Sequence, residues 1–198
     1  MLRKFFPTVF TMLCILLLAI GSGCGKAQEP QKLSLDKGKK TLVVFYSATG
    51  TTEKIAGYIT EALNADVLRL EPKEPYTGND LNYRNRSSRV CKEHDDESLR
   101  RVALVKNTVD NWNDYGTVFV GYPIWWGIAA WPVNDFIQSN DFTGKTVIPF
   151  STSISSGFGR SGELLSKLAG TGNWAQGENF FYGSPKDEIT AWLKAMGF

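Results

Sequence analysis

The sequence predicts an α/β domain built around a parallel sheet. Two runs, residues 42–46 and 117–121, are apolar at consecutive positions and not only at alternating ones. Such runs are typical of parallel strands that are covered by helices on both faces. Between them, Ile55, Ile59 and Leu63 recur every four residues, which indicates a helix with one apolar face. Strands and helices that alternate in this way predict a three-layer, doubly wound sheet with right-handed crossovers.

The predicted elements continue to the end of the chain. Proline removes a ladder donor, so Pro149 predicts a bulge or a strand end in the fourth strand. Residues 71–100 lack clear periodicity, and a loop of that length in a compact domain is usually functional or mobile. The elements in order are strand 42–46, helix 52–64, strand 66–70, strand 117–121, a strand ending at residue 150, strand 179–183 and a helix from residue 185.

A hydroxyl-rich loop follows the first strand directly. Ser47, Thr49, Thr51 and Thr52 surround Gly50 at the point where a helix begins. The first N–H groups of a helix have no partner within it, so these groups and the neighbouring hydroxyls can bind an anion together. The alternative interpretation is an ordinary strand-to-helix turn with a threonine cap.

The third strand ends in a second unusual loop, in which Pro123, Ile124, Trp125 and Trp126 precede Gly127. Open parallel sheets bind ligands beyond the carboxyl ends of their strands, so the two loops are expected to meet at one crevice. Adjacent tryptophans can stack on a flat aromatic cofactor and shield it from water. The alternative is that one or both tryptophans only pack in the core or at its rim.

These two loops resemble those of the flavodoxin-like family. Residues 47–52 satisfy the S/T-x-T-G-x-T phosphate-binding loop of flavodoxins. Residues 122–129, with Pro132, Asn134 and Phe136, are similar to a group described as flavodoxins or NAD(P)H-dependent oxidoreductases. The resemblance implies a five-stranded flavodoxin-like sheet of order 2-1-3-4-5, with FMN at the switch point between the first and third strands. It also implies that the first loop holds the FMN phosphate and that the second flanks the flavin ring.

The same resemblance implies a third loop that closes over the polar edge of the flavin through backbone donors. The residues concerned are Thr152, Ser153, Ser156 and Gly157. Related chains often carry two glycines where this chain has Ile154 and Ser155, and a positive φ there would strain Ile154. Residues 157–162 match G-x-G-x-x-G, but six residues separate them from the preceding strand, in the fourth unit, so no dinucleotide site is predicted.

The N-terminus is predicted to be a targeting segment. Arg3 and Lys4 precede an apolar run, and Gly21-Ser22-Gly23-Cys24 resembles the lipobox at which bacterial lipoproteins are cleaved and lipidated, here on Cys24. An uncleaved membrane anchor and plain secretion are the alternatives, and all three interpretations place the domain outside the cytoplasm. The predicted organisation is a lipoprotein-type signal peptide at 1–24, a solvated tether at 25–40 and a flavodoxin-like domain at 41–198.

Composition argues against several classes of function. Removing Arg3 and Lys4 from the 22 basic residues leaves 20, equal to the 20 acidic residues, so no nucleic-acid partner is predicted. Flavodoxins that dock soluble partners are strongly acidic, and this chain departs from them. Outside the signal, Cys91 and His94 are the only thiol and histidine, too few for an intrachain disulfide or a usual zinc site. Their spacing could suggest a thiolate and base pair, but the charges around them favour a solvated loop.

The resemblance implies an FMN-binding redox protein at the cell envelope. It would transfer electrons to a partner protein, or reduce a quinone-like acceptor with NAD(P)H. No side chain is predicted to be an essential acid or base, because the flavin carries the chemistry. The segment 71–100 resembles an insertion of the same family group, and no flavin contact is predicted there. The alternative function is a non-redox exported binding module that retains the fold, which Sec-type export of an unfolded, FMN-free chain favours.

Overall fold

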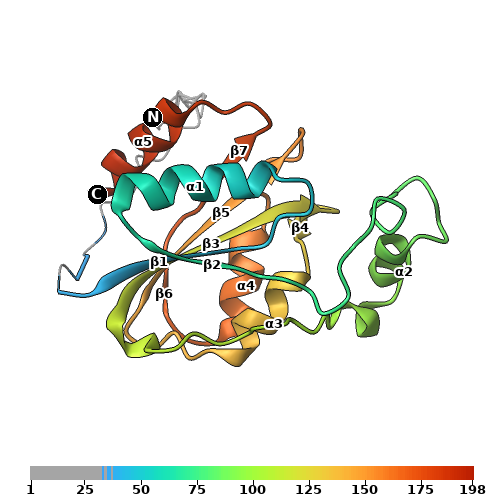
Figure 1. The fold of residues 1–198 in the computed structure, drawn as a ribbon, viewed down its shortest axis with the longest axis horizontal. Coiled ribbons are helices and arrows are strands. Elements are labelled where there is room, and N and C mark those ends of the chain that lie inside the picture. The colour runs from blue at the N-terminus through green and yellow to red at the C-terminus, as the bar shows by residue number, and fades with distance from the viewer. Residues whose placement is uncertain (1–32, 34, 37) are drawn as a thin grey trace, which may run out of the picture.

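The computed structural model describes residues 33, 35–36 and 38–198, which form a sheet covered by helices on both sides (Figure 1). The predicted signal peptide, Cys24 and most of the predicted tether lie outside the described residues. The strands are β1 (Lys40–Phe45), β2 (Asp66–Arg69), β3 (Tyr115–Trp125), β4 (Ile128–Ala129), β5 (Thr146–Ser153), β6 (Asn173–Trp174) and β7 (Glu178–Phe181). The α-helices are α1 (Thr51–Leu63), α2 (Arg89–Asp95), α3 (Pro132–Ser139), α4 (Ser161–Ala169) and α5 (Lys186–Met196), and two short 3-10 turns are η1 (Glu97–Arg100) and η2 (Trp112–Asp114).

The order of the sheet confirms the predicted topology. The strands run β2-β1-β3-β5, after which β6 and β7 both pair with β5, and every one of these pairings is parallel. The predicted fifth strand is β7, so the five predicted strands lie in the order 2-1-3-4-5. Two short strands are additions that the sequence pattern does not predict. Of these, β4 folds back antiparallel on the end of β3.

The two faces of the sheet are buried under different pairs of helices. In Figure 1, α1 and α5 cover one face, and α3 and α4 cover the other. In β1, Val43 and Phe45 pack with apolar residues of α1 and α5, whereas Leu42 and Val44 pack with those of α3 and α4. This double burial explains why the strand is apolar at consecutive positions.

The prediction of a bulge or strand end at Pro149 is wrong for β5 itself. The strand continues through Pro149, which pairs in register with Val120 of β3. The interruption lies in the neighbouring strand, because pairing with β6 ends at Val147 and pairing with β7 begins at Phe150. Ala175 donates to the carbonyl of Val147, so Pro149, two residues further on, turns its missing donor to this same side.

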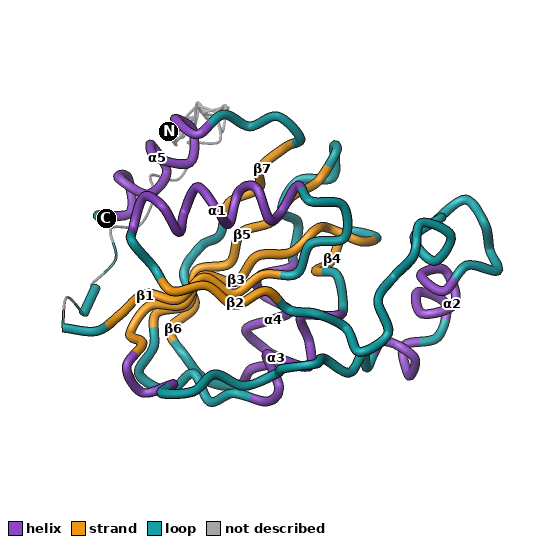
Figure 2. The backbone as a smooth tube through the Cα atoms, in the orientation of Figure 1, coloured by secondary structure: helices purple, strands orange, loops and turns teal. Residues whose placement is uncertain are grey.

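The long segment after β2 is partly helical. Residues 71–100, called the insertion below, contain α2 and η1. Figure 2 shows α2 and its flanking loops projecting beyond the end of the sheet at which β3 meets β4. Within the described residues, no helix combines the length and the apolar character that a membrane crossing needs.

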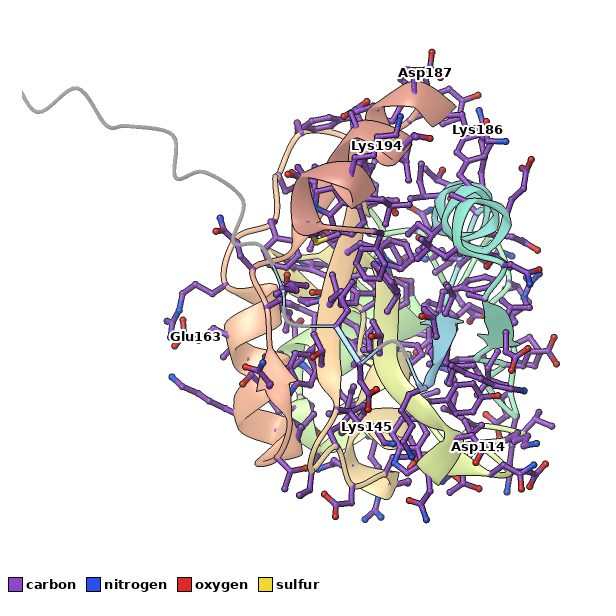
Figure 3. The ribbon with its side chains drawn as sticks, turned by 90° about the vertical axis from the view of Figure 1, so that its left-hand side faces the viewer. Asp114, Lys145, Glu163, Lys186, Asp187 and Lys194 are labelled. Atoms are coloured by element: carbon purple, nitrogen blue, oxygen red, sulfur yellow. The ribbon has the colours of Figure 1, made fainter. Side chains whose placement is uncertain are left out.

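The amino-terminal edge of the sheet is closed by paired polar groups. Lys145 is 5% exposed, and its Nζ donates to the carbonyls of Trp112 and Tyr115, at 2.7 Å each. The same Nζ lies 4.5 Å from the centroid of the Trp112 ring. Asp66 accepts a hydrogen bond from the Tyr115 hydroxyl at 2.8 Å, and this bond is the main cause that lowers the pKa of Asp66. Figure 3 shows Lys145 at one end of the molecule, near Asp114.

Candidate functional site

The carboxyl edge of the sheet holds a cavity of about 770 Å³. It is formed where the loops after β1, β3 and β5 come together, with the insertion and the loop after β7 completing its walls. The loops after β1 and β3 therefore meet at one crevice, as expected for the switch point of a doubly wound sheet. The cavity is lined by Ala48, Thr49, Thr51, Leu81, Tyr83, Val90, Pro123, Ile124, Trp125, Trp126, Thr152, Ser153, Ile154 and Tyr182.

One end of the cavity presents hydrogen-bond donors. Helix α1 begins after Gly50, whose φ of 90° suits glycine, and no side chain caps this helix start. The Ser47 hydroxyl accepts from the backbone N–H of Gly50 at 3.1 Å and so fixes the turn. Thr49 and Thr51 reach the cavity itself. An uncapped helix N-terminus beside two hydroxyls is a suitable site for a phosphate-like anion.

Thr52 has a different position from the other residues of the first loop. Its side chain is buried, and its hydroxyl shares a 2.7 Å hydrogen bond with the hydroxyl of Thr152. The Thr52 hydroxyl therefore joins the first loop to the third and does not line the cavity. The backbone N–H of Thr52 remains in the first turn of α1.

Trp125 lies in the wall of the cavity and in the core at the same time. Its ring meets the rings of Tyr46, Tyr76 and Trp131 edge-on, at centroid distances of 5.8, 5.4 and 4.8 Å. The neighbouring Pro123 and Ile124 also line the cavity. Trp125 therefore packs against the core and lines the cavity as well, and its stacking on a cofactor stays a prediction.

Trp126 and Gly127 form the two-residue turn that joins β3 to β4. Trp125 pairs with Ile128, and the two residues between them have φ values of 47° and 79°. Two consecutive positive φ angles in a two-residue hairpin are those of a type I′ turn, which favours Asn-Gly. Gly127 fits this turn, whereas a bulky residue at its first position is strained. Gly127 itself does not line the cavity, and the ring of Trp126 does.

The third loop is brought to the cavity only in part. Thr152 and Ser153 line it, and the Ser153 hydroxyl accepts from the N–H of Gly157 at 3.2 Å. Ser156 and Gly157 do not line it. Ile154 does line it, is 90% exposed and does not have a positive φ. The conditional expectation of strain at Ile154 does not apply, and the strained bulky residue of this edge is Trp126.

The sequence analysis missed six lining residues. Three of them, Leu81, Tyr83 and Val90, belong to the insertion, which was given no role in the site. The sequence did contain a signal for their position. The insertion follows β2, so it begins at the carboxyl edge of the sheet, where the loops after β1 and β3 also begin. Tyr182 follows β7 at that edge and is 86% exposed. Ala48 and Ile154 lie between residues that were predicted.

The lining of the cavity carries no Asp, Glu, Lys, Arg, His or Cys side chain among the described residues. Tyr46, which packs behind Trp125, has its pKa raised by burial and is a neutral phenol. The site therefore offers hydroxyl and backbone donors at one end and aromatic or aliphatic surface elsewhere. That arrangement can bind a flat apolar ring with an anionic group attached.

Comparisons with known proteins agree with this geometry. Residues 40–196 match the model of a flavodoxin family. The chain belongs to the flavodoxin family. No curated protein sequence matches it.

Two solved structures are similar in sequence as well as in fold. A protein from Bacteroides eggerthii that is assigned as a flavoprotein is 38% identical, with a TM-score of 0.72 over 80% of this chain and 98% of its own. A protein from Bacteroides uniformis with the same assignment is 37% identical, with a TM-score of 0.74 over 80% and 99%. A flavoprotein from Lactobacillus acidophilus, solved in complex with FMN, shares the fold at 19% identity and a TM-score of 0.56 over 78% of this chain and 99% of its own.

Proposed function

We propose that this chain binds FMN in the cavity and works as a redox protein of the cell envelope. One observation carries the proposal: the uncapped start of α1 and the tryptophan-bearing loop after β3 open into the same cavity. Family membership and the FMN complex of the Lactobacillus protein support the choice of this cofactor.

The residues present fit FMN by their chemistry. The first turn of α1, with Gly50, Thr49 and Thr51, would hold the phosphate through N–H and hydroxyl donors. Pro123, Ile124 and Trp125 would lie against the flavin ring and exclude water from it. Bound FMN supplies the electron transfer, and the protein supplies binding and the surroundings of the ring. The absence of charged groups from the described lining supports a role in which the cofactor carries the chemistry.

An enzymatic role is supported by the mouth of the cavity. Tyr182 and Tyr83 are exposed there at 86% and 65%, next to Ile154, which gives a flat molecule an apolar surface to approach. The formally neutral mature chain lacks the acidic surface that docks soluble electron carriers. We therefore favour reduction of a quinone-like acceptor by NAD(P)H over transfer to a soluble partner protein.

Two measurements test this function. FMN titrated into the purified full chain in detergent is expected to bind tightly with loss of flavin emission, because an aromatic wall quenches the ring. NADH and NADPH oxidation by the FMN-loaded protein is then measured with and without a quinone. Oxidation that needs the quinone supports the enzyme, and none in either condition favours a carrier. An absence of FMN binding would favour the non-redox exported binding module.

The envelope location is proposed from the sequence alone. Cleavage before Cys24 and lipidation of its thiol would anchor the domain through a tether. Cys24→Ala is expected to abolish labelling by a fatty acid and to prevent cleavage at this site, whereas Cys14→Ala, in the apolar run, retains both. Equal labelling of the two variants would remove the lipoprotein interpretation.

A further inference from the structure

The strained turn at Trp126 is braced by a histidine from the insertion. The ring of Trp126 stacks on that of His94, with centroids 4.4 Å apart and planes 22° apart. It also lies nearly parallel to the ring of Trp131, with centroids at 5.9 Å. Stacked aromatic rings stabilise one another beyond the apolar area that they bury. These contacts offset part of the cost of holding a bulky side chain at positive φ.

The helix that carries His94 is held firmly against the domain. Glu93 is 5% exposed, and its carboxylate accepts hydrogen bonds from Tyr76, Arg89 and Trp131, at 2.6, 2.7 and 2.7 Å. Arg89 belongs to α2 and Tyr76 to the same insertion, so the bond from Trp131 is the one of these three that ties α2 to the sheet domain. His94 follows Glu93 in α2, so the bonds of Glu93 also fix the place from which the His94 ring contacts Trp126.

His94 and the cavity lie beside the same residues. A hollow of about 210 Å³ adjoins the cavity, and Tyr83 and Trp126 line both spaces. His94 lines the hollow but not the cavity, and its ring stacks on Trp126, which lines both. The groups that face or contact His94 are Asp95, whose Oδ1 lies 3.0 Å from Nδ1, Arg86 and Cys91 in the hollow, Tyr83 and Trp126 across it, and Arg100, which donates to the His94 carbonyl.

We propose that His94 is a positioning residue: its ring stacks on Trp126 and sets the Trp126 wall of the cavity, and FMN binding depends on that wall. This inference rests on the proposed function. His94 is the single histidine of the chain, so its ring signals belong to one known residue.

A measurement without flavin tests the brace. In the FMN-free protein, the His94 ring protons are expected to be shifted upfield by the Trp126 indole, and Trp126→Leu should abolish that shift. NMR at one fixed pH measures the chemical shifts of this one histidine. Identical ring-proton shifts in wild type and Trp126→Leu would refute the brace, whether or not the protein binds flavin.

FMN titrations then test its consequence. His94→Phe keeps a flat ring that can stack on Trp126, whereas His94→Ala removes the ring. At one fixed pH, His94→Phe should bind FMN as wild type does, and His94→Ala should bind about tenfold more weakly.

A control comes from the same helix. Lys92→Ala shortens an exposed side chain of α2 and should leave the FMN affinity unchanged. Equal affinities of wild type, His94→Phe and His94→Ala would overturn the proposal while leaving FMN binding intact. If the wild type binds no FMN, the proposed function fails and the flavin part of this inference fails with it.

Discussion

The two ends of the sheet are built from the same strands and differ in how completely their polar and strained groups are satisfied. At the amino-terminal edge, Lys145 and Asp66 are paired with named partners at 2.7 to 2.8 Å. At the carboxyl edge, α1 starts without a side-chain cap, Trp126 is held at positive φ, and Tyr182 is exposed. Paired polar groups, as at the amino-terminal edge, are typical of regions that stabilise the fold. Uncapped, strained and exposed groups, as at the carboxyl edge, are typical of binding sites.

The largest effect is expected at the amino-terminal edge, on stability alone. Lys145→Met keeps an unbranched apolar stem but leaves the carbonyls of Trp112 and Tyr115 without their donor. Loss of hydrogen bonds from a charged, buried group should lower the free energy of unfolding by roughly 2–4 kcal/mol. Urea unfolding measures this loss, and FMN affinity should be unchanged. Lys106→Met, at an exposed lysine paired with Asp110, is the control and should stay within about 0.5 kcal/mol.

At the carboxyl edge, a substitution at the start of α1 should mainly lower the affinity for FMN. Gly50→Val forces a β-branched residue to a φ of 90° at the start of α1, so the first turn must shift. FMN affinity is expected to fall at least about tenfold, as measured by fluorescence titration. Gly57→Ala lies within the same helix, where a Cβ meets no other atom within 4 Å, and should leave FMN binding unchanged. Unchanged affinity in Gly50→Val would contradict the phosphate site.

A smaller effect should separate strain from contact at Trp126. Both Trp126→Asn and Trp126→Leu lose the rings stacked with His94 and Trp131, but only asparagine suits the first position of a type I′ turn. The free energy of unfolding of Trp126→Asn should therefore exceed that of Trp126→Leu by about 1 kcal/mol in the FMN-free protein, although asparagine is less apolar than leucine. Thermal unfolding tests the order. If leucine is the more stable, the turn stores no strain.

The sequence predicts this architecture well because a strand that is buried on both faces is apolar at consecutive positions. Leu42 and Val43 pack on opposite faces of the sheet, so the strand reads as one apolar run, and the order of strands followed from the flavodoxin-like loops. Pro149 shows the limit of this reasoning. Its effect depends on which neighbour its missing donor faces, and this is a property of the sheet and not of one strand.

The site could be predicted only where a loop is short. Thr49, Thr51 and Trp125 follow directly from strand ends, and they line the cavity. Tyr83 and Val90 reach the cavity from the 30-residue insertion, which Glu93 holds in place. Glu93 binds Tyr76 and Trp131, which are more than 50 residues apart in sequence, so these contacts could not be predicted from local sequence. The type I′ turn at Trp126 could not be predicted from the sequence either, because such turns disfavour a bulky residue at their first position.

The smallest effect is expected at a polar group that belongs to neither edge. Glu163 lies on the outer side of α4, as Figure 3 shows, and the hydrogen bonds from Arg160 and Lys167 lower its pKa to about 2. A carboxylate whose folded pKa is depressed stabilises the fold above its unfolded pKa of about 4.5, and this stabilisation is lost as pH falls towards 2. Glu163→Gln should therefore lower Tm slightly at pH 7, and the difference from wild type should vanish near pH 2. Because all three side chains are exposed, a large Tm difference at pH 7 would contradict the division of the molecule into one edge that carries stability and one that carries binding.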